Sequence, residues 1–175
     1  MVSGALVAER VPPKPDRLAV EDCPAFIADA MLGRLARWLR LAGYDTLYDW
    51  RLDDNELVRL LRLMGRTLLT RDTRLVARPR LESLLVRSQV LDEQLSEIRV
   101  AFGMPKNRGA FPRCPEDNTL LVAADRYEVE GLVPAYVWVK YDEFHRCPEC
   151  GRAYWPGTHY TGIRRRLERG AEVKV

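Results

Sequence analysis

Four carboxylates in the first half of the chain stand where predicted strands end or predicted helices begin. Asp29 and Asp72 follow predicted strands, and Asp54 and Glu56 lie at the start of a predicted helix. The carboxyl ends of parallel strands meet at one edge of a sheet, so these acids are expected to converge. Grouped carboxylates repel one another unless a cation lies among them, and an oxygen-only set suits Mg²⁺ or Mn²⁺. Such a site could activate water against a phosphodiester, although each acid taken alone could be a helix N-cap.

Arginines flank the predicted acidic edge. Arg34, Arg37 and Arg40 form a stripe opposite the apolar side of the predicted helix 30–42, and Arg71 immediately precedes one of the acids. The planar guanidinium suits bidentate contacts to phosphate, and a helix N-terminus also favours anions. We therefore expect Arg34, Arg37 and Arg71 to contact the phosphates of RNA. The alternative is that the stripe is an ordinary solvated helix surface.

Three cysteines and one aspartate in the last third of the chain have the spacing of a metal site. They lie in two similar tetrapeptides, Cys114-Pro-Glu-Asp117 and Cys147-Pro-Glu-Cys150. Two C-x-x-C turns at such a separation are typical of a zinc ribbon, in which each turn supplies two ligands of a tetrahedron. Asp117 stands where the second cysteine of the first turn is expected, and a carboxylate binds zinc more weakly than a thiolate does.

Other interpretations of this motif stay open at the level of sequence. His145 or His159 could supply the fourth ligand in place of the aspartate, or the site could have lost its metal. Cys147 and Cys150 could instead form a redox pair, but the glycine and the Tyr-Trp-Pro segment that follow do not open the helix that such a pair requires.

The composition is that of a folded domain. The 175 residues are 47% hydrophobic and 30% charged, which is enough for one full core. No run approaches the roughly 20 apolar residues that cross a bilayer, and the prolines and charges of residues 1–15 do not resemble a signal peptide, so we expect a cytoplasmic protein without membrane contact. The net charge of +3 is too small to indicate nucleic-acid binding by itself. Any basic surface must therefore come from local placement.

Strand-like and helix-like segments alternate from residue 25 to residue 102. The predicted strands are 25–28, 46–50, 66–70 and 84–86, and the predicted helices are 30–42, 54–64 and 92–102. This alternation predicts an α/β fold with a mainly parallel sheet covered on both faces. Helical spacing places Met31, Trp38 and Leu39 on the buried side of the predicted helix 30–42. It places Leu57 and Met64 on the buried side of the predicted helix 54–64.

The composition changes around residues 103–109, where turn residues replace the alternating pattern. We therefore predict three parts: an extended lead-in over residues 1–24, a nuclease-like core over residues 25–108, and a small ribbon-like module with a basic C-terminal helix over residues 109–175.

The chain resembles the Mut-seven C-terminal ribonuclease domain family, from about Phe26 to Leu167. The segments that carry the resemblance are residues 29–40, 43–45, 69–72, 93–95, 141–144, 147–152 and 154–160. The resemblance implies a PIN-like three-layer α/β/α domain with a C-terminal zinc ribbon, and a metal-dependent ribonuclease activity. It implies catalytic acids at Asp29, at Asp54 or Glu56, and at Asp72. The family usually has four zinc cysteines, so Asp117 is a departure from its pattern.

Two hypotheses for function follow. In the first, the protein is a Mg²⁺- or Mn²⁺-dependent ribonuclease: Asp29, Asp54 and Asp72 hold the metal, Glu56 assists, and Zn²⁺ lies among Cys114, Asp117, Cys147 and Cys150. In the second, it is a non-catalytic RNA- or ribosome-binding module. That module would use the ribbon and the basic tail 164–166, with Tyr154, Trp155 and Tyr160 available for base stacking. RNA is the expected partner in both, and the oligomeric state is left open.

Overall fold

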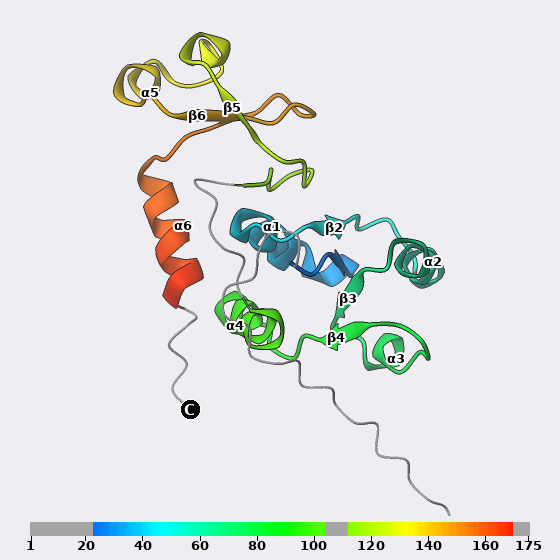
Figure 1. The fold of residues 1–175 in the computed structure, drawn as a ribbon. Helices are drawn as coiled ribbons and strands as arrows, with labels where there is room; N and C mark the ends of the chain where they lie inside the picture. The colour runs from blue at the N-terminus through cyan, green and yellow to red at the C-terminus, as the bar shows by residue number, and fades with distance from the viewer. Residues whose placement is uncertain (1–22, 104–111, 170–175) are drawn as a thin grey trace, which may run out of the picture.

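The structure is a computed structural model that describes residues 23–103 and 112–169. Its centre is a four-stranded, wholly parallel sheet in the order β2-β1-β3-β4. The strands are β1 (Phe26–Ala28), β2 (Thr46–Tyr48), β3 (Thr67–Thr70) and β4 (Ser83–Leu85). Helices α1 (Gly33–Ala42) and α4 (Leu91–Phe102) pack on one face, and α2 (Asp54–Met64) and α3 (Thr73–Val76) on the other. The predicted α/β/α fold of PIN-like type is therefore confirmed (Figure 1).

Alternate residues of the central strands supply the two cores. Phe26 and Leu69 pack with α1 and α4, whereas Ile27 and Leu68 pack with α2 and α3. All four of these side chains are fully buried, so neither central strand has a face exposed to solvent. Because the central strands are covered on both faces, their carboxyl ends are the edge at which side chains following them can meet a ligand.

Capping residues fix the ends of the helices that lead away from this edge. Asp53 and Glu56 form a capping box at the start of α2, which satisfies orphan backbone N–H groups there. Gly43 and Gly65 end α1 and α2 with φ of 101° and 61°, a left-handed conformation that costs glycine little. The predicted helix 54–64 is therefore confirmed, and each predicted strand is found within two residues of its expected bounds.

The predicted burial of the first two helices is wrong at three positions. Met31 lies in a 3-10 turn, η2 (Ala30–Leu32), that precedes α1, and this turn breaks the helical phase and leaves its side chain 59% exposed. Met64 lies in the last turn of α2 and is also exposed. Arg40, expected on the solvated stripe, is only 4% exposed. Arg40 is buried because its guanidinium bonds to backbone carbonyls of Thr46, Pro115 and Glu116.

The C-terminal part contains a second, antiparallel sheet in the order β5-β6-β7. Its strands are β5 (Val122–Ala124), β6 (Phe144–Arg146) and β7 (Ala153–Tyr154), and η3 (Arg126–Val129) and α5 (Ala135–Lys140) lie between the first two. Val129, Val133, Val137 and Phe144 form its own small core. The predicted boundary near residues 103–109 falls mostly on residues outside the described part, as does nearly all of the predicted lead-in 1–24, so the three-part division stays a prediction.

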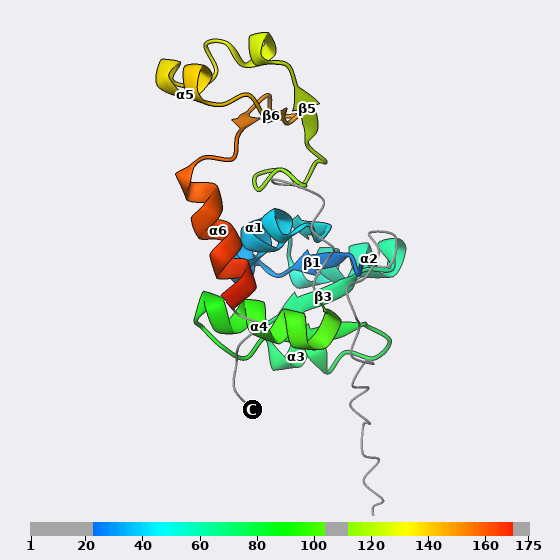
Figure 2. The same ribbon diagram turned by 60° about the vertical axis from the view of Figure 1, so that its left-hand side comes forward.

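The last helix, α6 (Thr158–Arg169), returns from this second sheet to the core. Figures 1 and 2 show it running beside α1 and α4. Leu167 packs against the core under these helices, and Arg166 forms an ion pair with Asp92 while its guanidinium lies 5.0 Å from the ring centre of Trp38. The basic tail is thus partly used to hold the two sheets together. In the described part of the chain, no helix has the length and apolar character needed to span a membrane.

Candidate catalytic edge and metal centre

Asp29 and Asp72 lie at the carboxyl ends of the neighbouring strands β1 and β3. Asp29 caps the turn η2 by accepting a hydrogen bond from the Ala30 N–H at 2.6 Å. The Thr70 hydroxyl donates to the other carboxylate oxygen of Asp29 at 2.6 Å and accepts from the Asp72 N–H at 2.9 Å. Through Thr70, the ends of the two strands are therefore joined by hydrogen bonds.

Asp72 also caps a helix and pairs with an arginine. Its side chain accepts from the Arg74 N–H at 2.8 Å, and the Arg74 guanidinium lies 3.1 Å from the second carboxylate oxygen. The side-chain hydrogen bond from Arg74, followed by the backbone one, holds the pKa of Asp72 below its ordinary value. Asp72 is therefore ionised at neutral pH, as a metal ligand must be.

Asp54 and Glu56 come from the first turn of α2. Asp54 is exposed and forms a long ion pair with Arg78, with 3.8 Å between the guanidinium nitrogen and the carboxylate oxygen. Its charge also raises the pKa of Arg74, after the larger effect of Asp72 on the same arginine. Glu56 accepts from the Asp53 N–H at 3.0 Å, so its nearest role is the capping box.

The four acids therefore take part in helix caps or in ion pairs with arginines. Within residues 23–103 and 112–169, the only group of three or more Cys, His, Asp or Glu side chains with closely converging ligand atoms is the cysteine cluster described below. Each Asp29 oxygen makes one hydrogen bond and retains a second lone pair for a cation. The oxygen-only donor set fits a hard divalent cation. That Asp29, Asp54 and Asp72 share one stays a prediction.

The arginines predicted to contact RNA have different surroundings. Arg34 is exposed. Arg37 is engaged by Glu116, whose two carboxylate oxygens each lie 2.7 Å from one guanidinium nitrogen. The buried Nε of Arg71 finds no hydrogen-bond partner among the described residues. The structure therefore leaves the Arg34 side chain available to a ligand, whereas the Arg71 Nε is buried and Arg37 must first release a carboxylate.

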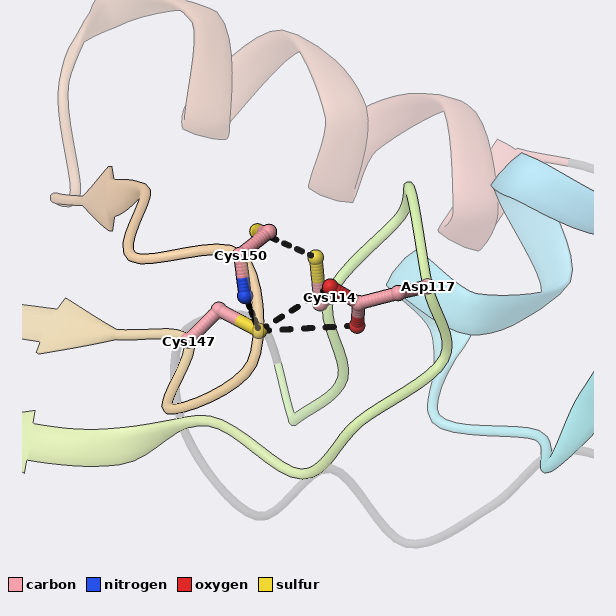
Figure 3. Close-up of side chains that lie close together, drawn as sticks. All are labelled: Cys114, Asp117, Cys147 and Cys150. Carbon is pink, nitrogen blue, oxygen red and sulfur yellow. Dashed lines mark hydrogen bonds between the residues drawn. The ribbon is translucent and has the colours of Figure 1, made fainter.

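Cys114, Asp117, Cys147 and Cys150 converge, as Figure 3 shows. One ligand atom from each lies within 4.8 Å of all the others. The Cys114 and Cys150 sulfurs are 3.7 Å apart, and the Cys147 sulfur is 3.2 and 3.4 Å from the two oxygens of Asp117. Zinc–sulfur bonds of about 2.3 Å in a tetrahedron place neighbouring sulfurs about 3.8 Å apart, so the donor set fits such an ion.

Two similar turns present these four side chains. The Asn118 N–H donates to the Cys114 carbonyl, and the Gly151 N–H to the Cys147 carbonyl, each at 3.0 Å. Gly151 has φ of 73°, which allows the second turn to reverse immediately after its last ligand. The shared turn geometry explains why the x-x spacing survives although one thiol has become a carboxylate.

The protonation of the cluster follows from its burial and internal hydrogen bonds. Burial opposes ionisation of Asp117, but hydrogen bonds from the Thr119 N–H and the Cys147 thiol outweigh it and keep its pKa well below the ordinary value. Burial, together with the nearby Asp117 carboxylate, raises the pKa of Cys150 to about 12. Burial also raises the pKa of Cys147, whose thiol would be the attacking one in a redox pair and would need a lowered pKa, so the redox interpretation finds no support here.

Neither histidine is shown as a ligand. His145 lies in β6, outside the converging group, and its buried Nδ1 has no hydrogen-bond partner among the described residues. The side chain of His159 lies outside the described part. Asp117 is therefore the fourth member of the group that the structure shows.

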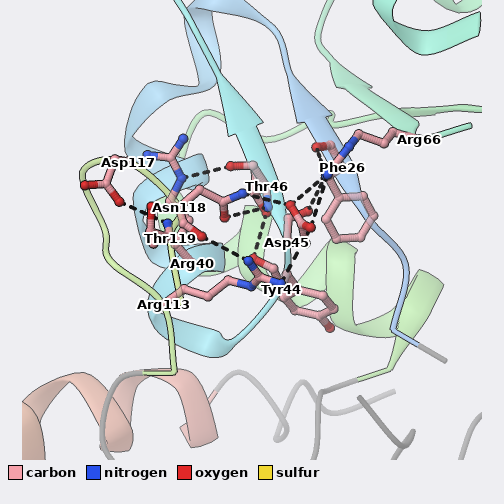
Figure 4. Close-up of polar contacts among 10 residues, drawn as sticks. All are labelled: Phe26, Arg40, Tyr44, Asp45, Thr46, Arg66, Arg113, Asp117, Asn118 and Thr119. Carbon is pink, nitrogen blue, oxygen red and sulfur yellow. Dashed lines mark hydrogen bonds and ion pairs between the residues drawn. The ribbon is translucent and has the colours of Figure 1, made fainter. Parts of the chain in front are cut away.

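The first turn of the cluster is fastened to the parallel sheet by buried polar contacts (Figure 4). Arg40 of α1 donates from Nε to the Thr46 carbonyl at 2.8 Å and from Nη1 to the carbonyls of Pro115 and Glu116 at 3.0 and 2.7 Å. These two carbonyls belong to residues between Cys114 and Asp117. Arg40 is buried because it spans from the edge strand β2 to the turn that carries Cys114 and Asp117.

A second set of contacts runs through Asp45 and Asn118. Asn118 accepts from the Thr46 N–H at 3.0 Å and donates to Asp45 at 2.7 Å, and Asp45 pairs with Arg66 at 2.7 Å and Arg113 at 3.5 Å. Burial would raise the pKa of Asp45, but hydrogen bonds from Arg66 and Asn118 outweigh it and lower that pKa. No role was assigned to Asn118 from the sequence. Asp45 was included only as part of segment 43–45, which carries the family resemblance.

The fold and the two sites define a PIN-like α/β/α domain with a Cys/Asp cluster fastened to its edge. Comparison with family models identifies the Mut7-C RNAse domain over residues 24–167. That match covers most of the 175 residues, and the chain belongs to this family. Its membership indicates a ribonuclease-type function. Neither the curated proteins nor the solved structures give a match.

Proposed function

We propose that the protein is a metal-dependent ribonuclease whose reaction takes place at the carboxyl edge of the parallel sheet. Asp29, Asp54 and Asp72 would hold Mg²⁺ or Mn²⁺, and such an ion, when bound, polarises the phosphodiester and activates water for in-line attack. The observation that carries the proposal is the hydrogen-bonded chain from Asp29 through Thr70 to Asp72, which joins two acids from neighbouring strands.

The chain's own residues have definable tasks in this proposal. Thr70 orients the Asp29 carboxylate by donating to one of its oxygens, leaving lone pairs on both for a cation. Glu56 fixes the start of α2 through its hydrogen bond to the Asp53 N–H, and this sets the position of Asp54. Arg71 directly precedes Asp72 in the chain, and its guanidinium would contact a phosphate oxygen of the substrate. Arg74 and Arg78 neutralise Asp72 and Asp54 until a cation takes over that role.

The Cys114, Asp117, Cys147 and Cys150 cluster would hold Zn²⁺ as a structural ion. Four protein ligands leave no open position, which is the arrangement of structural rather than catalytic zinc. The hydrogen bonds of Arg40 and Asn118 would then join the ion-bound Cys114–Asp117 turn to β2 and restrict the movement of that strand.

The non-catalytic alternative receives less support. Tyr154, one of the aromatic side chains proposed for base stacking, bonds through its hydroxyl to the Cys114 sulfur at 3.2 Å, and Trp155 packs against the small core of the second sheet. Arg166 of the basic tail is paired with Asp92. These side chains hold the module together, so RNA binding through them competes with its structure.

The test of the proposal is cleavage of labelled single-stranded RNA by the full chain, with Mn²⁺ and without added divalent cation. The proposal expects cleavage only with Mn²⁺, and its loss in Asp29→Asn. The matched control is Asp142→Asn, which neutralises an exposed acid that lies in the second module and pairs only with Arg126 among the described residues. Cleavage that persists without divalent cation, or that survives Asp29→Asn, contradicts the proposal.

A further inference from the structure

An open groove runs along the outer side of α2. Its volume is about 440 Å³. Asn55, Arg59 and Arg62 line it from one stripe of α2, since residues four and three apart share a helix face. The segment after α3 forms the other wall with Arg78 and Pro79.

The groove is basic and has no acidic residue in its lining. Arg59 and Arg62 are exposed, and neither forms an ion pair within the described part of the chain. Among the residues that the structure describes, the Arg78 guanidinium forms one ion pair, the 3.8 Å contact with Asp54. Three guanidinium groups around one groove, two of them without a carboxylate, provide a surface for an anion that carries more than one negative charge.

The groove also has an apolar wall. Val58 is nearly buried at its floor, whereas Leu63 is 71% exposed at its side and Pro79 faces it from the loop. A chain that offers phosphates on one side and flat apolar rings on the other matches both kinds of lining. Single-stranded RNA has this character, because its bases are unstacked and its phosphates are accessible.

One end of the groove adjoins the acidic edge. Asn55 follows Asp54 directly, and Arg78 is ion-paired with Asp54. A strand lying in the groove would therefore extend from the predicted catalytic acids along α2. By contrast, Arg37 and Arg40 of α1 are already bound to Glu116, in the turn between Cys114 and Asp117.

We propose that the groove lined by Arg59, Arg62 and Arg78 binds the phosphates of single-stranded RNA next to the bond that is cleaved. This inference rests on the proposed ribonuclease function and adds to it the path of the substrate. It replaces α1 with α2 as the main source of phosphate contacts.

The test measures binding separately from cleavage. Fluorescently labelled single-stranded RNA is titrated with the full chain at several salt concentrations without added Mg²⁺ or Mn²⁺. The double variant Arg59→Gln with Arg62→Gln is compared with Arg164→Gln with Arg165→Gln, which removes the same charge from exposed positions of α6. We expect the α2 variant to bind roughly tenfold more weakly and the slope of log affinity against log salt to fall by about 0.7 for each lost phosphate contact. The α6 variant should bind as the wild type does, and thermal unfolding verifies that both variants fold.

The outcomes separate the two proposals. If the wild type binds and cleaves RNA but the α2 variant keeps its affinity and salt slope, the proposed RNA binding in the groove is wrong and the proposed ribonuclease function stands. If the α6 variant loses affinity instead, the RNA path runs over the basic tail and the groove is likewise overturned. If the wild type neither binds nor cleaves RNA, both proposals fail. With Mn²⁺ added, the α2 variant should show a raised KM and an unchanged kcat, since the groove holds substrate and does not touch the reacting atoms.

Discussion

The acidic edge and the cysteine cluster each contain four potential metal ligands. The two sets differ in how closely their ligand atoms converge. In the cluster, ligand atoms from two separate turns already lie within 4.8 Å of one another. At the acidic edge, Asp29 and Asp72 act as helix caps, and Arg74 and Arg78 pair with the acids. A structural site must hold its ion permanently, whereas a hydrolytic site needs open positions for water and substrate. The comparison therefore shows converging ligand atoms in the cysteine cluster, and acids engaged in caps and ion pairs at the edge of the parallel sheet.

The largest effect is expected at the acidic edge. Asp29→Asn removes a charge but keeps a hydrogen-bond acceptor for Thr70 and Ala30, so RNA cleavage should fall at least about a thousandfold while the protein stays folded. Initial rates with Mn²⁺ and circular dichroism measure the two quantities. A variant that cleaves at the wild-type rate would show that Asp29 is only a cap, and the contrast between the two regions would disappear.

Loss of a ligand from the cysteine cluster should instead lower the thermal stability of the protein by a large amount. We expect one zinc ion per chain by elemental analysis, and Cys147→Ser should lower Tm by about 10 °C, which corresponds to roughly 3 kcal/mol for a chain of this size. Cys23→Ser is the matched control, because Cys23 lies outside the cluster. Asp117→Cys should increase zinc affinity by replacing a hard ligand with a soft one. Protein that contains no zinc and whose Tm is insensitive to Cys147→Ser would contradict the metal assignment.

Arg40 sharpens the comparison, because it ties the Cys114–Asp117 turn to the parallel sheet. Burial lowers the pKa of Arg40, yet its hydrogen bonds to three carbonyls compensate for the lost hydration. Arg40→Met would leave the carbonyls of Thr46, Pro115 and Glu116 without this donor and should cost about 2–3 kcal/mol in the free energy of unfolding. Arg37→Met breaks only an exposed ion pair and should cost less than about 1 kcal/mol. Urea unfolding of both variants measures the difference, and equal losses would mean that the buried bonds add nothing.

The smallest expected effect is a pH dependence at the same junction. The pKa of Asp45 lies below its ordinary value of 3.8, so its contribution to stability is fully present above that value and is lost as the pH falls through the lowered pKa. Asp45→Asn should therefore be less stable than the wild type at pH 7 and show a flatter loss of stability below pH 4. Urea unfolding between pH 2 and pH 7 tests this. An acid limb that Asp45→Asn leaves unchanged would show that other carboxylates dominate acid unfolding.

The sequence predicted most of the parallel core because local signals specify it. The short runs Phe26–Ala28, which is apolar, and Thr67–Thr70, whose two central residues are leucine, mark strands buried on both faces, and Gly43 and Gly65 mark helix ends. The sequence failed at Met31 because a 3-10 turn there changes the helical phase. The predicted roles of Asp29, Asp54, Glu56 and Asp72 stay predictions, because the contacts that the structure describes for these acids are helix caps and ion pairs.

By itself, the sequence determined the strands, the helix caps and the C-x-x-C spacing, since each depends on residues only a few positions apart. Only the tertiary structure decided that Asp117 turns toward the cysteines, that Arg40 is buried, and that Arg59, Arg62 and Arg78 share a groove. Arg40 and Pro115 are 75 positions apart, and Thr46 and Asn118 are 72. Contacts at such separations form only when the two sheets pack together. Packing removes water from polar side chains and backbone groups between the sheets, and each such group then needs a hydrogen-bond partner in the protein.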